Sequence, residues 1–333
     1  MVNVSVSPHI RSRLSTSTVM GDVAIALLPA LLFGVFVFGL RALLIILVSV
    51  ATCLLSEYLY QRLMKFPVTV GDGSALVTGL ILAMNLPASV PFWVPMMGGV
   101  FAILFVKQFF GGVGQNIMNP ALAARCFLLI SFPALLGGSM PAVGNMVGAD
   151  MWQNFVRRMS ALPPDATTMA TPLQVLKNGE SIDLLQAFLG LHSGCIGETS
   201  SLAILLGFGY MLFRGVVSPR IPSLMVLFTV GFVALFRVAQ GEPVTVNYIL
   251  GQVCTGGLLA GAVFMATDYT TSPITPWGQV LYCLLLGLLT AALRVFGSSA
   301  EGVSYAIVIG NTLVPLMEKV TMPRPFGKRG AAR

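Results

Sequence analysis

The sequence contains few charged residues. Of its 333 residues only 9% are Asp, Glu, Lys or Arg, whereas 56% are hydrophobic, and the mean hydropathy is +0.87. A soluble globular chain carries about a quarter charged residues. The composition therefore excludes an ordinary water-soluble protein, and the chain is better divided into membrane spans of about 20 apolar residues each.

Residue patterns that hold metals and nucleotides are also missing. Two histidines, His9 and His192, are too few for haem or a di-metal centre. The five cysteines have no C-x-x-C pair and no regular spacing, which argues against a disulfide framework and against zinc or iron–sulfur ligation. There is no Walker A motif, and Gly-Gly-Val-Gly at 111–114 follows an apolar segment rather than a strand. We expect no metal site and no complete active site on this chain alone.

What the sequence does contain is ten apolar runs in two sets of five. A stretch rich in Gly, Pro, Ser, Thr and Asp separates the sets at 137–200. We predict an all-α integral membrane protein of about ten transmembrane segments, with an N-terminus at 1–20, a first membrane repeat at 21–136, a second at 201–318 and a basic C-terminus at 319–333. The expected segments are 21–40, 42–60, 74–86, 91–110, 117–136, 201–213, 223–240, 247–266, 276–296 and 302–318.

The two sets of apolar runs look related. Residues 74–112 and 256–299 each begin with a short Gly-containing apolar piece, continue through a Pro/Ser interruption and contain a Trp near the start of a full span. A repeat with an odd number of spans must insert with opposite orientation. Short, Gly/Pro-interrupted segments at matching places in two such halves indicate a buried ligand site.

The distribution of basic residues predicts the orientation. The excess of 19 basic over 12 acidic residues does not indicate a nucleic-acid partner, because the basic residues lie mostly at the ends of apolar runs. If all ten segments cross from a cytoplasmic N-terminus, twelve basic residues lie inside and six outside, three of the six in the long loop. The positive-inside rule then predicts that both termini are cytoplasmic and that 137–200 is extracytoplasmic.

One motif in the long loop suggests a covalent site. The sequence Asp-Ala-Thr-Thr-Met-Ala-Thr-Pro-Leu-Gln begins at Asp165 and places Thr171 before Pro172. The simplest interpretation is a helix start, since Thr is a good N-cap and Pro is accepted at the first helical position. The same geometry would present the Thr171 hydroxyl from an extended backbone and offer a helix N-terminus to a phosphate. Both interpretations stay open on the residues alone.

Several blocks of the sequence resemble a known family. The motif ending at Thr171 is similar to the flavin-transfer motif of the membrane flavin subunits of the Rnf electron-transport complex and of the sodium-pumping NADH:quinone reductase. The resemblance extends over nearly the full length, and the short N-terminus is more similar to the Rnf (Rsx) D subunits than to the longer B subunit of the reductase. The other similar blocks are 7–12, 71–87, 111–125 and 264–279.

The resemblance implies a cofactor and its position. Thr171 matches the threonine that accepts FMN in a phosphoester linkage, with Asp165, Ala170 and Leu173 completing the motif around it. A separate flavin transferase would add the FMN outside the cytoplasm, which agrees with the orientation from charge. The resemblance also implies a urea-transporter-like arrangement of two inverted repeats and a second, noncovalent riboflavin between the halves. We expect Asn119 and Asp268 to lie near that riboflavin.

The family also implies location and partners. It predicts the bacterial inner membrane, other membrane and peripheral subunits of an Rnf-type complex, including a second covalent-flavin subunit and iron–sulfur subunits, and oxidation of ferredoxin or NADH on those partners. The chain would relay electrons through its FMN and help couple them to ion movement. A channel or small-solute transporter without a redox cofactor is the main alternative, and a structural scaffold is another.

Polar residues within or beside the apolar segments form a second group of candidates. Such groups are costly in a membrane and are by default candidates for function. The alternatives are helix capping, hydrogen bonding between helices, or an arginine that extends to the membrane surface. The group comprises Glu57, Asp72, Asn85, Asn116, Asn119, Arg125 and Asp268.

Overall fold

The computed structural model describes residues 15–136, 172–297 and 302–322. These residues form helices and connecting loops. They contain no β-strand, only an isolated antiparallel bridge between Pro87 and Cys195. The prediction of an all-α protein is confirmed for these parts of the chain.

Five main helical segments precede the long loop. Two long helices form a hairpin around Gly39, whose positive φ of 77° turns the chain between them. The segments that follow are shorter. In order they are α1 (Thr16–Phe38), α2 (Leu40–Leu63), η1 (Val70–Asp72), α3 (Ser74–Met84), α4 (Trp93–Phe101) with its π-helical continuation η2 (Ala102–Gln108), α5 (Pro120–Ser131) and α6 (Pro133–Leu136).

Five more segments follow the loop, after two short helices. One of them is broken: α12 and α13 meet at a bend of 54°. The elements are α8 (Pro172–Lys177), α9 (Leu184–Leu189), α10 (Ser201–Phe213), α11 (Arg220–Ala239), α12 (Val246–Cys254), α13 (Leu258–Ala260) with the π-helical η3 (Gly261–Met265), α14 (Pro276–Phe296) and α15 (Val303–Thr321).

The predicted segments agree with these helices, with differences at the ends. The predicted runs 201–213 and 276–296 coincide with α10 and α14. Helix α1 begins at Thr16, inside the range assigned to the N-terminus, because the Ser15 side chain accepts a hydrogen bond from the Thr18 N–H and caps it there. Polar residues can therefore start a helix several positions before its apolar run.

The helices suit a membrane. Four of them, α1, α2, α11 and α14, are long and apolar enough to cross one, and the bent pair α12–α13/η3 makes up to five. Large apolar side chains also point outward, where they would be unfavourable in water. Among the most exposed are Leu47, Leu55, Leu63, Leu227, Leu235 and Phe213. An integral membrane protein is thereby supported, while the ten-span inverted topology stays a prediction.

Two buried basic residues support the repeat. Lys107, near the end of η2, donates to the hydroxyl of Ser74, the first residue of α3, at 2.6 Å. Arg294, near the end of α14, donates to the Gly256 carbonyl just before α13 at 2.8 Å. Both side chains are 3% exposed. Each half thus places a basic side chain from one helix against the start of its short, interrupted helix.

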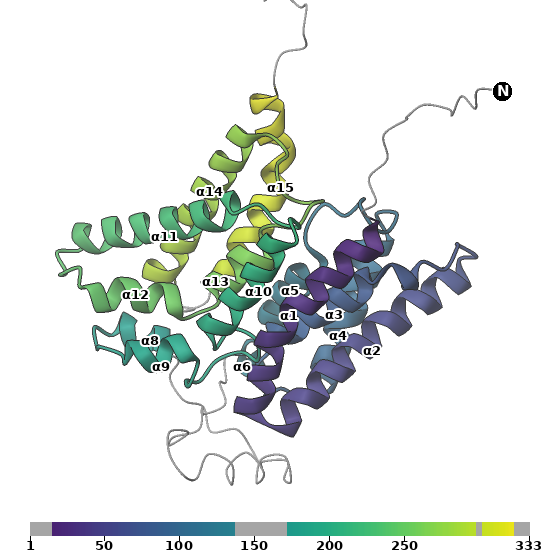
Figure 1. Ribbon diagram of the computed structural model, residues 1–333, viewed down its shortest axis with the longest axis horizontal. Helices are drawn as coiled ribbons and strands as arrows, with labels where there is room; N and C mark the ends of the chain where they lie inside the picture. The colour runs from purple at the N-terminus through teal and green to yellow at the C-terminus, as the bar shows by residue number, and fades with distance from the viewer. Residues whose placement is uncertain (1–14, 137–171, 298–301, 323–333) are drawn as a thin grey trace, which may run out of the picture.

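The two halves pack side by side (Figure 1). Helix α1 of the first half lies against α10 of the second. The start of α1 and the end of α15 lie on one side of the molecule, at the top of the view, whereas α6, α8 and α9 lie at the opposite side. The described ends of the chain therefore share one side, and the helices that flank 137–171 share the other. Which side is cytoplasmic stays a prediction.

Close approach between α1 and α10 depends on glycine. A Cβ on Gly207 would lie 2.1 Å from the Ala26 carbonyl oxygen, which is far inside van der Waals contact. Gly209 lies two residues further along the same helix, and a Cβ added to it would have no atom within 4 Å.

We predict that Gly207→Ala destabilises the fold by about 1–3 kcal/mol, because the added methyl group overpacks the contact between the halves. The matched variant Gly209→Ala should leave stability unchanged or raise it by up to about 1 kcal/mol, because Ala favours the helix. Thermal unfolding of both variants in the same detergent measures the difference. Equal effects of the two substitutions would contradict this packing.

Candidate functional site

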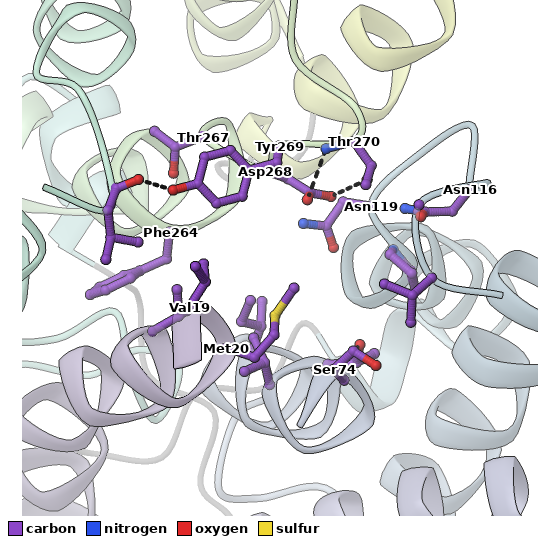
Figure 2. A pocket seen from close by; sticks show the side chains of 18 of the residues that line it. Val19, Met20, Ser74, Asn116, Asn119, Phe264, Thr267, Asp268, Tyr269 and Thr270 are labelled. Atoms are coloured by element: carbon purple, nitrogen blue, oxygen red, sulfur yellow. Dashed lines mark hydrogen bonds between the residues drawn. The ribbon is translucent and has the colours of Figure 1, made fainter. Parts of the chain in front are cut away.

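A pocket opens between the two halves on the side where α1 begins. Residues from α1, α3 and η2 line it from the first half, and residues from α10, η3 and the following loop line it from the second. Figure 2 shows side chains from both halves facing one another across it. They include Val19, Met20, Ser74, Asn119, Phe264 and Asp268.

Asn119 and Asp268, the predicted riboflavin neighbours, both line this pocket. Asn119 accepts hydrogen bonds from the N–H groups of Ala121 and Leu122 and caps α5, so the helix-capping interpretation holds for it. Asp268 accepts from the hydroxyls of Thr270 and Thr271, at 3.3 and 3.2 Å, in the loop after η3. The structure brings the two residues to one pocket, and their contact with a ligand stays a prediction.

The walls of the pocket are mostly apolar, with a smaller number of polar groups. Val77, Ile81 and Phe264 provide apolar surface, while Asn116 and Asp268 provide hydrogen-bonding groups. Withdrawal from water raises the pKa of Asp268 above its ordinary value, against hydrogen bonds from Thr270 and Thr271 that lower it. Such a lining suits a flat ligand with an apolar body and a polar edge.

A buried ionic cluster adjoins this pocket. The Lys107 ammonium, which lines the pocket, donates to Glu57 at 2.7 Å, and Gln108 donates to the same carboxylate oxygen at 3.0 Å. Glu57 is fully buried. The hydroxyl of Ser74 continues the cluster to the Asp72 carboxylate at 2.5 Å. Lys107 is thus an interior residue whose ammonium neutralises the buried Glu57 carboxylate.

A second ionic cluster lies between the halves. The Arg125 guanidinium of α5 donates to the Glu198 carboxylate at 2.5 Å, to the Asn85 amide oxygen and to the Cys195 sulfur at 3.6 Å. Both charged side chains are 5% exposed. Arg125 therefore does not extend to the membrane surface; it makes hydrogen bonds inside the protein, to the C-cap residue of α3 and to the segment before α10.

The residues before α10 form a buried segment, although the sequence places them in the extramembrane loop. The Ile196 N–H donates to the Leu86 carbonyl at 3.0 Å, and the Gly197 N–H donates to the Met84 carbonyl at 2.9 Å. Ile196 is fully buried, and a Cβ on Gly34 would lie 2.0 Å from its carbonyl oxygen. The segment is buried because it satisfies the backbone groups that the end of α3 leaves open.

Of the flavin-motif residues, only Leu173 lies within the described parts of the chain; Asp165, Ala170 and Thr171 lie outside them. Helix α8 begins at Pro172, as the helix-start interpretation predicts. Leu173 is buried and packs on Gly256, where a Cβ would lie 2.6 Å from the Leu173 Cδ2. The helix that follows Thr171 is therefore anchored to the second half of the membrane domain.

His192 lines a small pocket with Pro172, Leu173 and Glu198. Its Nε2 is buried without a hydrogen-bond partner among the described residues. Burial lowers the pKa of this imidazole below its ordinary value. No sequence signal marks His192, because Pro172, Leu173 and Gly256, which line the same pocket, come from other parts of the chain. The described residues hold no group of three metal-ligating side chains.

These features define a class: a helical membrane protein of two packed halves with buried ion pairs and a partly polar pocket between them. The chain matches the NQR2, RnfD, RnfE family over residues 3–327 and belongs to that family.

Named relatives cover almost the whole chain. It is 43% identical to the D subunit of the Na(+)-translocating ferredoxin:NAD(+) oxidoreductase complex of Acetobacterium woodii over 332 residues, 98% of this chain and 95% of the relative. It is 37% identical to the D subunit of the Proton-translocating ferredoxin:NAD(+) oxidoreductase complex of Clostridium ljungdahlii, with 98% and 96% covered. The D subunit of the Ion-translocating oxidoreductase complex of Stutzerimonas stutzeri is 36% identical, with 96% and 95% covered.

We predict that removing one member of the Arg125–Glu198 pair is costly. Arg125→Met should destabilise the chain by about 3–5 kcal/mol, because it leaves a buried carboxylate without its cation. The double variant Arg125→Met/Glu198→Gln should recover part of that loss. Thermal unfolding of the single and double variants tests this coupling, and strictly additive losses would contradict it.

Proposed function

We propose that this chain is a membrane subunit of an ion-translocating electron-transport complex of the ferredoxin:NAD(+) oxidoreductase type. The observation that carries the proposal is full-length similarity to relatives named as the D subunits of such complexes. Those names include both a sodium- and a proton-translocating complex, so the proposal extends to a monovalent cation without choosing between them. The chain would act in the bacterial inner membrane with its 137–200 loop extracytoplasmic.

We propose further that Thr171 carries FMN through a phosphoester bond. The Asp165–Leu173 motif supports this, as does α8, which begins one residue after Thr171 and is anchored by Leu173 and Leu176, 3% and 1% exposed. An anchored helix restricts where a group on the preceding residue can reach. A bound flavin would supply one-electron and two-electron redox chemistry. The protein would hold it against the second half and keep it from dissociating.

The chain's own residues near α8 fit such a group. The buried Nε2 of His192 lacks a partner among the described residues and lines a pocket with Pro172. A neutral imidazole can donate to or accept from a polar ligand edge. Glu198 lines the same pocket. Its carboxylate is paired with the Arg125 guanidinium, so the two charges neutralise each other.

The pocket between the halves is the proposed site of a second, noncovalent flavin of the riboflavin type. Apolar walls from Val77, Ile81 and Phe264 would cover a flat ring system, and Asn119 and Asp268 would contact its polar edge or chain. Lys107 lines the same pocket and would bring a positive charge close to it.

Partners and maturation follow from the same proposal. A flavin transferase would modify Thr171, and peripheral iron–sulfur subunits and a second covalent-flavin subunit would exchange electrons with this chain. The alternative of a passive channel has less support, because the three relatives above are named as subunits of oxidoreductase complexes.

The covalent flavin is tested by in-gel fluorescence of the denatured chain after co-expression with a flavin transferase. We expect fluorescence in the wild type and none in Thr171→Ala, because the variant lacks the acceptor hydroxyl. Thr168→Ala, which removes a neighbouring hydroxyl of the same motif, is the control and should remain fluorescent. If the wild-type chain shows no fluorescence although the transferase is active, Thr171 does not carry flavin and its motif marks only the start of a helix.

The noncovalent flavin is tested by extraction from the native chain. Flavin released by acid should fall at least about tenfold in Val19→Trp, because the indole would occupy the pocket and forfeit most of the ligand's contacts. Ile25→Trp, on the lipid-facing surface of the same helix at 50% exposed, is the control and should retain flavin. Equal flavin content in the two variants would show that the flavin does not bind in this pocket.

A further inference from the structure

The second half of the chain has a polar pocket on the α8 side, which shares Leu173 with the proposed flavin motif. Residues of α8, α11, α12, α14 and the α11–α12 loop line it. We call it the basic pocket. The residues that carry the argument are Lys177, Arg237, Glu242, Tyr248, Gln252 and Arg294.

The lining of the basic pocket has a positive charge. It contains three cationic side chains and one carboxylate, a net charge of 3 − 1 = +2. Arg237 pairs with Glu242 at 2.8 Å and lies over the Tyr248 ring at 3.9 Å. Lys177 donates to the Gly297 carbonyl, an acceptor that carries only a partial charge. An anion in the pocket would therefore meet more positive than negative charge.

Two of the three cations are held largely out of water, whereas Lys177 is exposed. Arg294 is 3% exposed and donates to the carbonyls of Gln252 and Gly256 at 2.6 and 2.8 Å. The Arg237 side chain is 12% exposed. Charges that are partly withdrawn from water attract an anion more strongly than surface charges do.

Apolar side chains on the same helices point away from the protein. They lie within a few positions of the pocket residues, on α11, α12 and α14, and water would not favour their exposure. They are Leu235 (58% exposed), Val238 (64%), Val246 (73%), Leu250 (44%) and Phe296 (63%). A ligand that combines a negative head with hydrocarbon chains would contact both kinds of surface.

We propose that the basic pocket binds the phosphate group of an anionic phospholipid, whose acyl chains lie along the exposed apolar faces of α11, α12 and α14. A free phosphate would use the same cations but would gain nothing from the apolar residues. The site is separate from the pocket between the halves and does not depend on the proposed redox function. Through Lys177 and Leu173 it would hold α8, and with it the start of the second half, against the membrane.

The test is native mass spectrometry of the full-length chain in detergent, made without a flavin transferase, with phosphatidylglycerol or phosphatidylcholine of identical acyl chains. The wild type should bind phosphatidylglycerol preferentially. Lys177→Gln and Arg237→Gln should each weaken that binding about fivefold, the equivalent of ~1 kcal/mol per basic side chain. Arg237→Lys should keep the preference, which separates loss of charge from loss of folding.

Arg62→Gln is the matched control, because Arg62 is an exposed residue of α2 whose guanidinium contacts Tyr58. It should bind as the wild type does. The proposal is overturned if the wild type does not distinguish the two lipids, or if Arg62→Gln weakens binding as much as the pocket variants. Competition by glycerol 3-phosphate at equal concentration would assign the pocket to a free phosphate. If attachment of flavin to the chain abolishes lipid binding, the basic pocket is a binding site for the cofactor and not for a lipid.

Discussion

Arg125 and Glu198 form an ion pair where surrounding helices exclude water and a lone charge would have no compensation. Arg125 comes from α5 in the first half, and Glu198 comes from the segment before α10 in the second. The Glu198 carboxylate also lies against the start of α13, where a Cβ on Gly257 would approach it to 2.6 Å. The pair therefore fixes the two halves and the buried 195–198 segment relative to one another, and the sites on both sides depend on that arrangement.

The interrupted helices explain where the other buried charges lie. A helix that ends inside a membrane protein leaves carbonyl and N–H groups without partners, and such groups are costly away from water. Arg294 donates to carbonyls at the end of α12, and Lys107 contacts the start of α3. The same interruptions open space between the halves, and the pocket with Asn119 and Asp268 lies there. The broken helices and the pocket between the halves therefore have the same structural origin.

The two proposed flavin positions lie on different sides of the molecule. Helix α8, which follows Thr171, lies with α6 and α9, whereas the pocket between the halves is lined by residues at the start of α1 (Figure 1). Glu198 lines the small pocket beside α8, so the Arg125–Glu198 pair adjoins the first of these positions.

The sequence alone determined the membrane class, the helical fold and the approximate limits of most segments. Apolar runs of this length are typical of helices that cross a membrane. The family resemblance also led to the expectation that Asn119 and Asp268 lie near one ligand, and both line the same pocket. The sequence could not assign Lys107, Glu198 or Arg294, since each gains its role from partners far along the chain. Only the tertiary structure decided that 195–198 is buried and that Lys107 and Arg294 are held inside the protein, because burial depends on which helices pack together.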